Sequence, residues 1–151
     1  MSLSSDLPGT WMLESRIDVT KAGERRPEPL LGEDPIAILF LDRAGHFAAQ
    51  FMKRNRTLVA LPAAAAGPKN NTQAQGGYDA YFGTYSVDDA TGVVTHTLMA
   101  SLSQGNVGMV LQRSMEVNGD KLRIQLETTA ADGTPVIRTL TWRRVGQADS
   151  R

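Results

Sequence analysis

The sequence predicts an all-β fold, an antiparallel meander of strands that closes into a barrel. Three observations predict it. Apolar and polar residues alternate from the first strand onward, tight-turn signals separate most of the strands, and little of the chain has helical periodicity. Strands at near-regular spacing joined by short turns are typical of up-and-down barrels. The mouth of the barrel is then the first place to look for a function.

The first predicted strand covers residues 10–19, directly after Gly9. Its residues alternate at a period of two, as a half-buried strand requires. We expect the inner face to carry Trp11, Leu13, Ile17 and Val19, and the outer face to carry Glu14, Arg16 and Asp18. Residues 21–35 follow with several prolines and glycines, which predict a loop.

The remaining strands are predicted from apolar or alternating runs between turn signals. They are residues 36–41, 46–53, 81–87, 93–102, 107–117, 121–127 and 135–145. Turns are predicted at residues 42–45, 88–92, 118–120 and 131–133. The sequence Asn118-Gly119 in the third of these is among the strongest short hairpin signals.

Residues 54–77 do not fit the strand pattern. A stretch of this length without alternation usually forms a lid, a binding loop or a disordered segment. Asn71 or Thr72 could cap a short helix over residues 72–79, although Gly76-Gly77 opposes a stable one. We therefore expect a long crossing loop, or a short helix, over one end of the barrel.

Composition excludes several classes of function. The chain of 151 residues has 16 basic and 16 acidic side chains, so it lacks the basic excess of a nucleic-acid-binding protein. It contains no cysteine, which excludes disulfides and thiolate ligands, and its two histidines lack the spacing of a zinc site. We expect neither a metal nor a cofactor.

Length and hydropathy predict one domain over residues 1–151, large enough to bury roughly two-thirds of the surface of the unfolded chain. The N-terminal residues lack a basic and then apolar signal segment, and no apolar stretch is long enough to span a membrane. These features predict a cytoplasmic protein.

Three segments of the chain resemble a known family. The first is residues 9–13, beginning Gly-Thr-Trp. The second is residues 81–88, beginning Tyr-Phe-Gly-Thr-Tyr, followed by residues 92–96. The third comprises residues 106–108 with 112–113, then 119–122 and 140–144, and it contains Trp142 and ends in Arg144. This set is similar to the bacterial and fungal lipocalin-like domain family, and the similarity extends over nearly the whole chain. It implies an up-and-down, calycin-type barrel of eight to ten strands, but it implies little about a ligand or a reaction.

The resemblance also implies a structural role for Trp11 and Arg144. In lipocalin-like barrels a tryptophan of the first strand packs beneath the core, and a basic residue of the last strand covers it. Such a cation–π contact contributes about 1 kcal/mol beyond the area that is buried. We expect these two residues to close the barrel floor and assign them no ligand.

Two residues with polar side chains are expected to face the interior. His96 alternates with Val94 and Leu98, and Arg113 alternates with Leu111 and Met115. A buried guanidinium requires an anionic or strongly polar partner. For Arg113 that partner is either a carboxylate of the protein, Glu116 or Asp79, or the carboxylate of a ligand. Arg138 also shares a face with apolar residues, but it lies near a strand end where it can emerge into water.

The tyrosines and methionines complete the candidate pocket. Tyr81 and Tyr85 share one face, and Gly83 between them leaves room for a molecule to approach the wall. Phenol rings suit amphipathic ligands, because they offer apolar area and a hydroxyl group. Three methionines add adaptable lining if they face inward: Met99, Met109 and Met115.

The preferred hypothesis is the binding of a small hydrophobic or amphipathic molecule, including carboxylated ones, by Tyr81, Tyr85, His96 and Arg113. Two alternatives remain open at this stage. One is an isomerase, cyclase or lyase of a hydrophobic metabolite that uses His96 as acid and base, with Arg113 or a tyrosine stabilising an oxyanion. The other is a solid-core barrel that acts in protein interaction. The size and polarity of the interior distinguish the three.

Overall fold

The structure, a computed structural model, describes residues 2–56 and 71–146. These residues form a nearly all-β fold with one short helix, one 3-10 turn and a single antiparallel sheet. No helix among them is long and apolar enough to cross a membrane. In chain order the elements are α1 (Leu3–Asp6), β1 (Gly9–Val19), β2 (Arg25–Arg26), β3 (Ile36–Leu41), β4 (His46–Met52), β5 (Tyr78–Asp88), β6 (Val93–Ser101), η1 (Gln104–Asn106), β7 (Val110–Asn118), β8 (Lys121–Thr129) and β9 (Pro135–Arg144).

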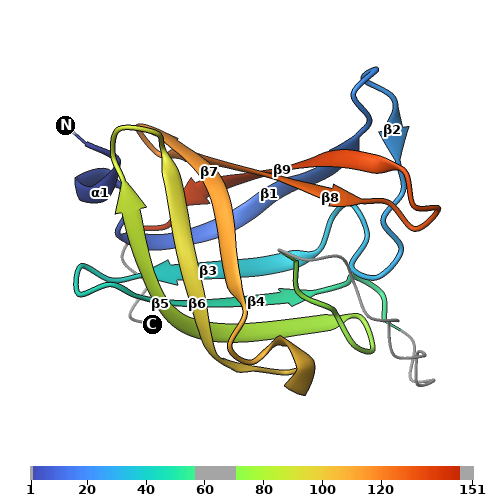
Figure 1. Ribbon diagram of the computed structural model, residues 1–151, viewed down its shortest axis with the longest axis horizontal. Helices are drawn as coiled ribbons and strands as arrows, with labels where there is room; N and C mark the ends of the chain where they lie inside the picture. The colour runs from blue at the N-terminus through green and yellow to red at the C-terminus, as the bar shows by residue number, and fades with distance from the viewer. Residues whose placement is uncertain (1, 57–70, 147–151) are drawn as a thin grey trace.

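The sheet closes because β1 pairs on one side with β3 and on the other with β9. Eight strands complete the barrel, and β2 is a two-residue addition that pairs with the far end of β1. Neighbouring strands otherwise follow chain order, as in a meander. The predicted antiparallel up-and-down barrel is confirmed. Figure 1 shows α1 at one end of the barrel and β2 at the opposite end.

A bulge in β1 changes which residues face the interior. Pairing with β9 shifts register between Leu13 and Ser15, so one extra residue enters β1. An extra residue sends every later side chain to the opposite face. Arg16 and Asp18 are therefore buried, whereas Ile17 and Val19 are only partly buried. The expected apolar inner face is correct at Trp11 and wrong beyond the bulge.

A second irregularity lies between β5 and β6, where the register shifts between Phe82 and Gly83. Val94, His96 and Leu98 point inward, so Met99, the residue after Leu98, points outward and is 59% exposed. Met99 therefore does not meet the condition for lining a pocket. Gly83 leaves no room for a ligand either, because a Cβ there would lie 1.8 Å from the Thr97 carbonyl oxygen. The backbone of β6 occupies that space.

The region expected to cross one barrel end is only partly described. Residues 57–70 of the predicted 54–77 segment lie outside the described residues. Residues 71–77 contain no helix, and Gln75 forms an isolated antiparallel bridge with Tyr78. Strand β5 consequently begins three residues before the predicted start at Tyr81. Strand β7 starts at Val110, later than expected, because η1 occupies residues 104–106.

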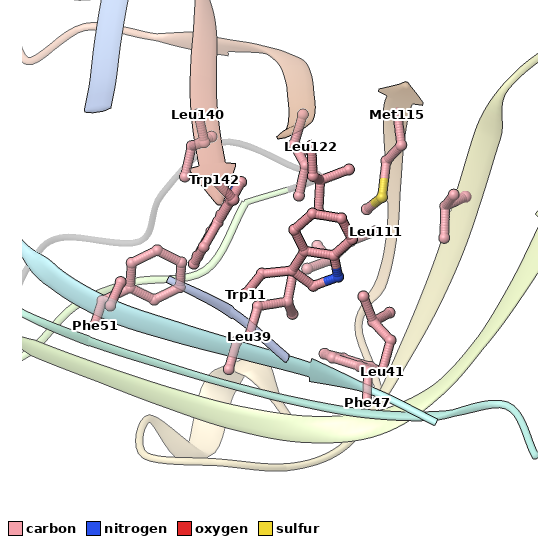
Figure 2. Close-up of a cluster of buried hydrophobic side chains, with 14 of the residues drawn as sticks. Trp11, Leu39, Leu41, Phe47, Phe51, Leu111, Met115, Leu122, Leu140 and Trp142 are labelled. Carbon is pink, nitrogen blue, oxygen red and sulfur yellow. The ribbon is translucent and has the colours of Figure 1, made fainter. Parts of the chain in front are cut away.

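The hydrophobic core packs around the residues predicted to close the barrel floor. Trp11 is fully buried among leucine, phenylalanine and tryptophan side chains (Figure 2). Its indole N–H donates a hydrogen bond to the Leu7 carbonyl at 3.0 Å, and the Arg144 guanidinium lies 4.2 Å from its ring centre. Arg144 also donates hydrogen bonds to the carbonyls of Asp6 and Pro8. The predicted pairing of Trp11 with Arg144 is confirmed.

Candidate functional site

A cavity of about 90 Å³ lies inside the barrel. Its wall is formed by inward residues of most strands, together with Leu30 and Leu31 from the loop before β3 and with Asn71 and Thr72 from the segment before β5. Aromatic and aliphatic side chains supply most of this wall. The polar side chains are fewer, and they come both from the strands and from the segments that contain Glu28, Asn71 and Thr72.

Three of the four candidate residues lie on this wall: Tyr81 of β5, His96 of β6 and Arg113 of β7. Tyr85 does not. Its ring lies beside that of His96, with 6.4 Å between the centres, and its hydroxyl donates to the Asp42 carbonyl at 2.6 Å, in the turn between β3 and β4. Tyr85 therefore supports His96 from outside the cavity.

His96 is a buried, neutral imidazole. It is 5% exposed, and the ring of Phe47 meets it edge-on with 4.5 Å between the ring centres. Burial, assisted by the positive charge of Arg113, lowers the pKa of His96 to about 3. The Nδ1 atom has no hydrogen-bond partner among the described residues. Near pH 7 this side chain is thus a poor proton acceptor, but its ring nitrogens can donate or accept a hydrogen bond from a bound guest molecule.

Arg113 supplies a positive charge to the same wall. The residue is 8% exposed, and one Nη donates to the carbonyl of Gln112 at 3.0 Å. Burial lowers the pKa of Arg113 to about 10, so the guanidinium stays protonated at neutral pH. Glu116, one of its two expected protein partners, is exposed and pairs with Arg123 at 2.7 Å. That expectation is wrong, because Glu116 lies on the opposite face of β7.

Asp79, the other expected partner, does lie on the cavity wall. It is 2% exposed, and the Thr72 hydroxyl donates to its Oδ2 at 2.7 Å. Its Oδ1 has no hydrogen-bond partner among the described residues. Burial raises the pKa of Asp79 to about 6, because the charged form loses hydration. Asp79 shares the inward face of β5 with Tyr81, so the alternation of that strand already indicated its direction.

A buried network of charges lies near the cavity. Arg138 donates two hydrogen bonds to the carboxylate of Asp18, at 2.7 and 3.0 Å, and Arg16 pairs with Glu28 at 3.0 Å. Burial alone would raise the pKa of Glu28, but the charge of Arg16 and the N–H of Leu31 outweigh it and lower that pKa. Burial also lowers the pKa of Arg16.

Most of this network was not predicted from the sequence. Arg16 and Asp18 were expected on the outer face because alternation does not reveal the bulge in β1, and Arg138 was expected to be able to emerge into water. Arg138 is in fact 5% exposed. Its alternation with Leu140 and Trp142 was the signal that could have shown its burial.

Trp142 adds a third buried polar atom without a partner. Its ring packs edge-on against Phe51, 5.8 Å between centres, and lines the cavity, but its Nε1 has no hydrogen-bond acceptor among the described residues. The unpartnered buried atoms found in the described part of the chain are Asp79 Oδ1, His96 Nδ1 and Trp142 Nε1. All three belong to residues that line this one cavity. Such exceptions are rare in folded proteins and call for an explanation.

The same residues offer no clear metal site. Within residues 2–56 and 71–146, no three His, Asp or Glu side chains gather closely enough to hold a metal ion. The cavity instead combines apolar area with the guanidinium groups of three arginines, the carboxyl groups of Glu28 and Asp79, and the ring nitrogens of His96 and Trp142. That combination suits hydrogen bonding to an organic molecule.

The closed eight-stranded antiparallel barrel around an internal cavity is the architecture of a lipocalin-like β-barrel protein. Residues 8–145, which include all nine strands, match the family described as lipocalin-like domain. The chain belongs to this family. No curated protein matches the chain in sequence.

Proposed function

We propose that this barrel binds a small amphipathic molecule in its cavity, with a carboxylate or similar acceptor group directed at Arg113. Tyr81 and His96 belong to the same site, and Tyr85 supports the His96 ring. The observation that carries the proposal is the convergence of three unpartnered buried polar atoms on one cavity that also contains a protonated guanidinium. The single-domain organisation and the cytoplasmic location stay predictions from the sequence.

The size of the cavity bounds the guest. About 90 Å³ is small beside the roughly 300–1,000 Å³ of pockets that bury drug-sized ligands. The present shape therefore suits a compact molecule, or the polar end of a longer one. An apolar wall formed by Phe47, Phe51 and Met115 suits a hydrocarbon body next to the polar group.

Electrostatics favour an acid as the polar group. Arg113 is protonated at neutral pH, and the indole N–H of Trp142 can only donate. A carboxylate accepts hydrogen bonds from both kinds of donor, and bonds to charged donors are stronger than neutral ones. The other two arginines on the wall are matched by carboxylates of the protein, because Arg138 pairs with Asp18 and Arg16 pairs with Glu28.

The two alternative functions receive less support. A solid-core barrel is disfavoured by the cavity itself. Catalysis with His96 as acid and base is disfavoured because the imidazole pKa of about 3 lies far from neutral pH and its Nδ1 has no second titratable partner among the described residues.

A matched pair of probes tests the proposal. Hexanoate and hexanamide have the same number of heavy atoms, but only hexanoate is charged. Arg113→Met keeps the aliphatic bulk and removes the guanidinium. It should therefore weaken the binding of hexanoate by about 1.5–3 kcal/mol, the size of a charged hydrogen bond. Hexanamide binding should change little. Dissociation constants from ligand-observed NMR would measure both effects.

Arg123→Met is the control, because Arg123 is exposed on the barrel exterior. It should leave the affinity for hexanoate unchanged, and circular dichroism would verify that both variants fold. Failure of wild-type protein to bind hexanoate, or equal affinity in wild type and Arg113→Met, would contradict the proposal.

A further inference from the structure

We propose that Asp79 forms a second polar end of the cavity and selects guests that carry a hydrogen-bond donor in addition to an acid group. The guest class is then a small hydroxy acid with an apolar body. This inference rests on the proposed function, because it adds a second contact to the same guest. It assigns the acceptor role to one atom, Asp79 Oδ1.

The surroundings of Asp79 leave this acceptor available. Thr72 covers Oδ2 with a 2.7 Å hydrogen bond, but no described residue donates to Oδ1. The residue is 2% exposed, so bulk water does not solvate the carboxylate freely. Leaving a buried acceptor without a donor is energetically unfavourable, because the acceptor loses its hydrogen bonds to water. A hydroxyl of the guest would remove that penalty.

A purely structural role accounts poorly for this carboxyl group. Among the described residues no ion pair includes Asp79, although the positive charge of Arg16 acts on its carboxyl group. A core position that needed only packing would be more stable with an apolar side chain of similar size. Asp79 is therefore better explained by what enters the cavity than by what surrounds it.

The position of Asp79 separates the two polar ends of the guest. Asp79 lies on β5 and Arg113 on β7, with β6 between the two strands. Tyr81, two residues beyond Asp79, interacts electrostatically with both of them. A guest that places its carboxylate near Arg113 thus has its apolar body beside Tyr81 and Phe51, and a hydroxyl further along it can reach Asp79.

The charge of Asp79 also predicts which guests are rejected. At pH 7.5 the carboxyl group is ionised, because its pKa of about 6 lies below that pH. A second carboxylate at this end of the cavity would meet this like charge, and Arg16, whose positive charge also acts on Asp79, is already paired with Glu28. Dicarboxylates should therefore bind less tightly than monocarboxylates of the same length.

The test compares hexanoate with the isomeric hydroxyhexanoates that carry the hydroxyl at carbon 3, 4, 5 or 6, and with hexanedioate, at pH 7.5. In wild-type protein the best hydroxylated isomer should bind about tenfold more tightly than hexanoate, the ratio expected for a hydrogen bond to a charged group. Hexanedioate should bind more weakly than hexanoate. In Asp79→Leu the advantage of the hydroxyl should disappear and the penalty on hexanedioate should fall.

Two further variants sharpen the result. Asp34→Leu makes the same substitution at an exposed carboxylate and should retain the wild-type preference. Asp79→Asn keeps the shape and removes the charge, so it should reduce the hydroxyl advantage even where Asp79→Leu fails to fold. A wild-type protein that binds no hydroxylated isomer more tightly than hexanoate overturns the inference, and so does an advantage that survives in Asp79→Leu.

The outcomes separate this inference from the function on which it rests. If wild-type protein binds hexanoate in an Arg113-dependent manner but binds the hydroxylated acids no more tightly, the role proposed for Asp79 is wrong and the proposed function stands. If wild-type protein binds neither hexanoate nor any hydroxylated isomer, the proposed function fails as well.

Discussion

Trp11→Ala should lower the free energy of unfolding by about 3–5 kcal/mol, the range for truncating a large buried aromatic residue. Trp11 is fully buried at the centre of the barrel floor. The substitution removes its packing, its hydrogen bond to Leu7 and its contact with Arg144 together. The surrounding strands are joined in a closed sheet and cannot easily move in to fill the space. Urea unfolding followed by circular dichroism would measure the change.

Phe82→Ala provides the comparison, because Phe82 is also aromatic and lies in a barrel strand but is 51% exposed. Phe82→Ala should lower the free energy of unfolding far less than Trp11→Ala does. Similar losses for the two variants would show that Trp11 does not hold the floor together.

Asp18→Leu should destabilise the protein by about 3 kcal/mol, the lower end of the range for breaking a buried ion pair. The substitution leaves the guanidinium of Arg138 buried without its two-bond partner. Glu28 lies close enough to interact with Arg138, which keeps the expected cost at the lower end. Arg138→Met should lower the stability by a similar amount, because it leaves the Asp18 carboxylate buried without its partner.

The double variant Asp18→Leu, Arg138→Met shows whether the two side chains contribute to stability as a pair or independently. Replacing both partners with apolar groups removes the uncompensated charge, so much of the stability should return. Losses that simply add in the double variant would mean that the two side chains act independently, contrary to the geometry.

The sequence predicted the barrel well because strand alternation and turn chemistry are local signals. The Asn118-Gly119 turn joins paired strands, and Trp11 meets Arg144 across β1 and β9. What alternation could not predict were the two register shifts. Each of them inserts one residue where the barrel bends, and this depends on closure of the sheet rather than on the local sequence. Arg16 and Asp18 were placed on the wrong face because they follow the shift in β1.

The site was predictable to the extent that its strands are regular. Tyr81, His96 and Arg113 lie on stretches without an intervening bulge, and alternation places them inward. Tyr85 faces the same way but lies nearer the strand end, where its hydroxyl reaches the Asp42 carbonyl. No sequence pattern could show that Asp79 Oδ1 and Trp142 Nε1 lack partners, because that depends on every group packed around them.

The two tryptophans of the chain allow a direct test of binding inside the barrel. In a ¹⁵N-labelled protein each indole N–H gives its own NMR signal, and Trp11→Phe would assign the pair. Trp142 Nε1 lines the cavity without a partner, whereas Trp11 Nε1 is bonded to Leu7 on the floor. Titration with hexanoate should shift the Trp142 signal saturably and leave the Trp11 signal in place. Binding of hexanoate with no shift at Trp142 would place the ligand outside the cavity and contradict the account.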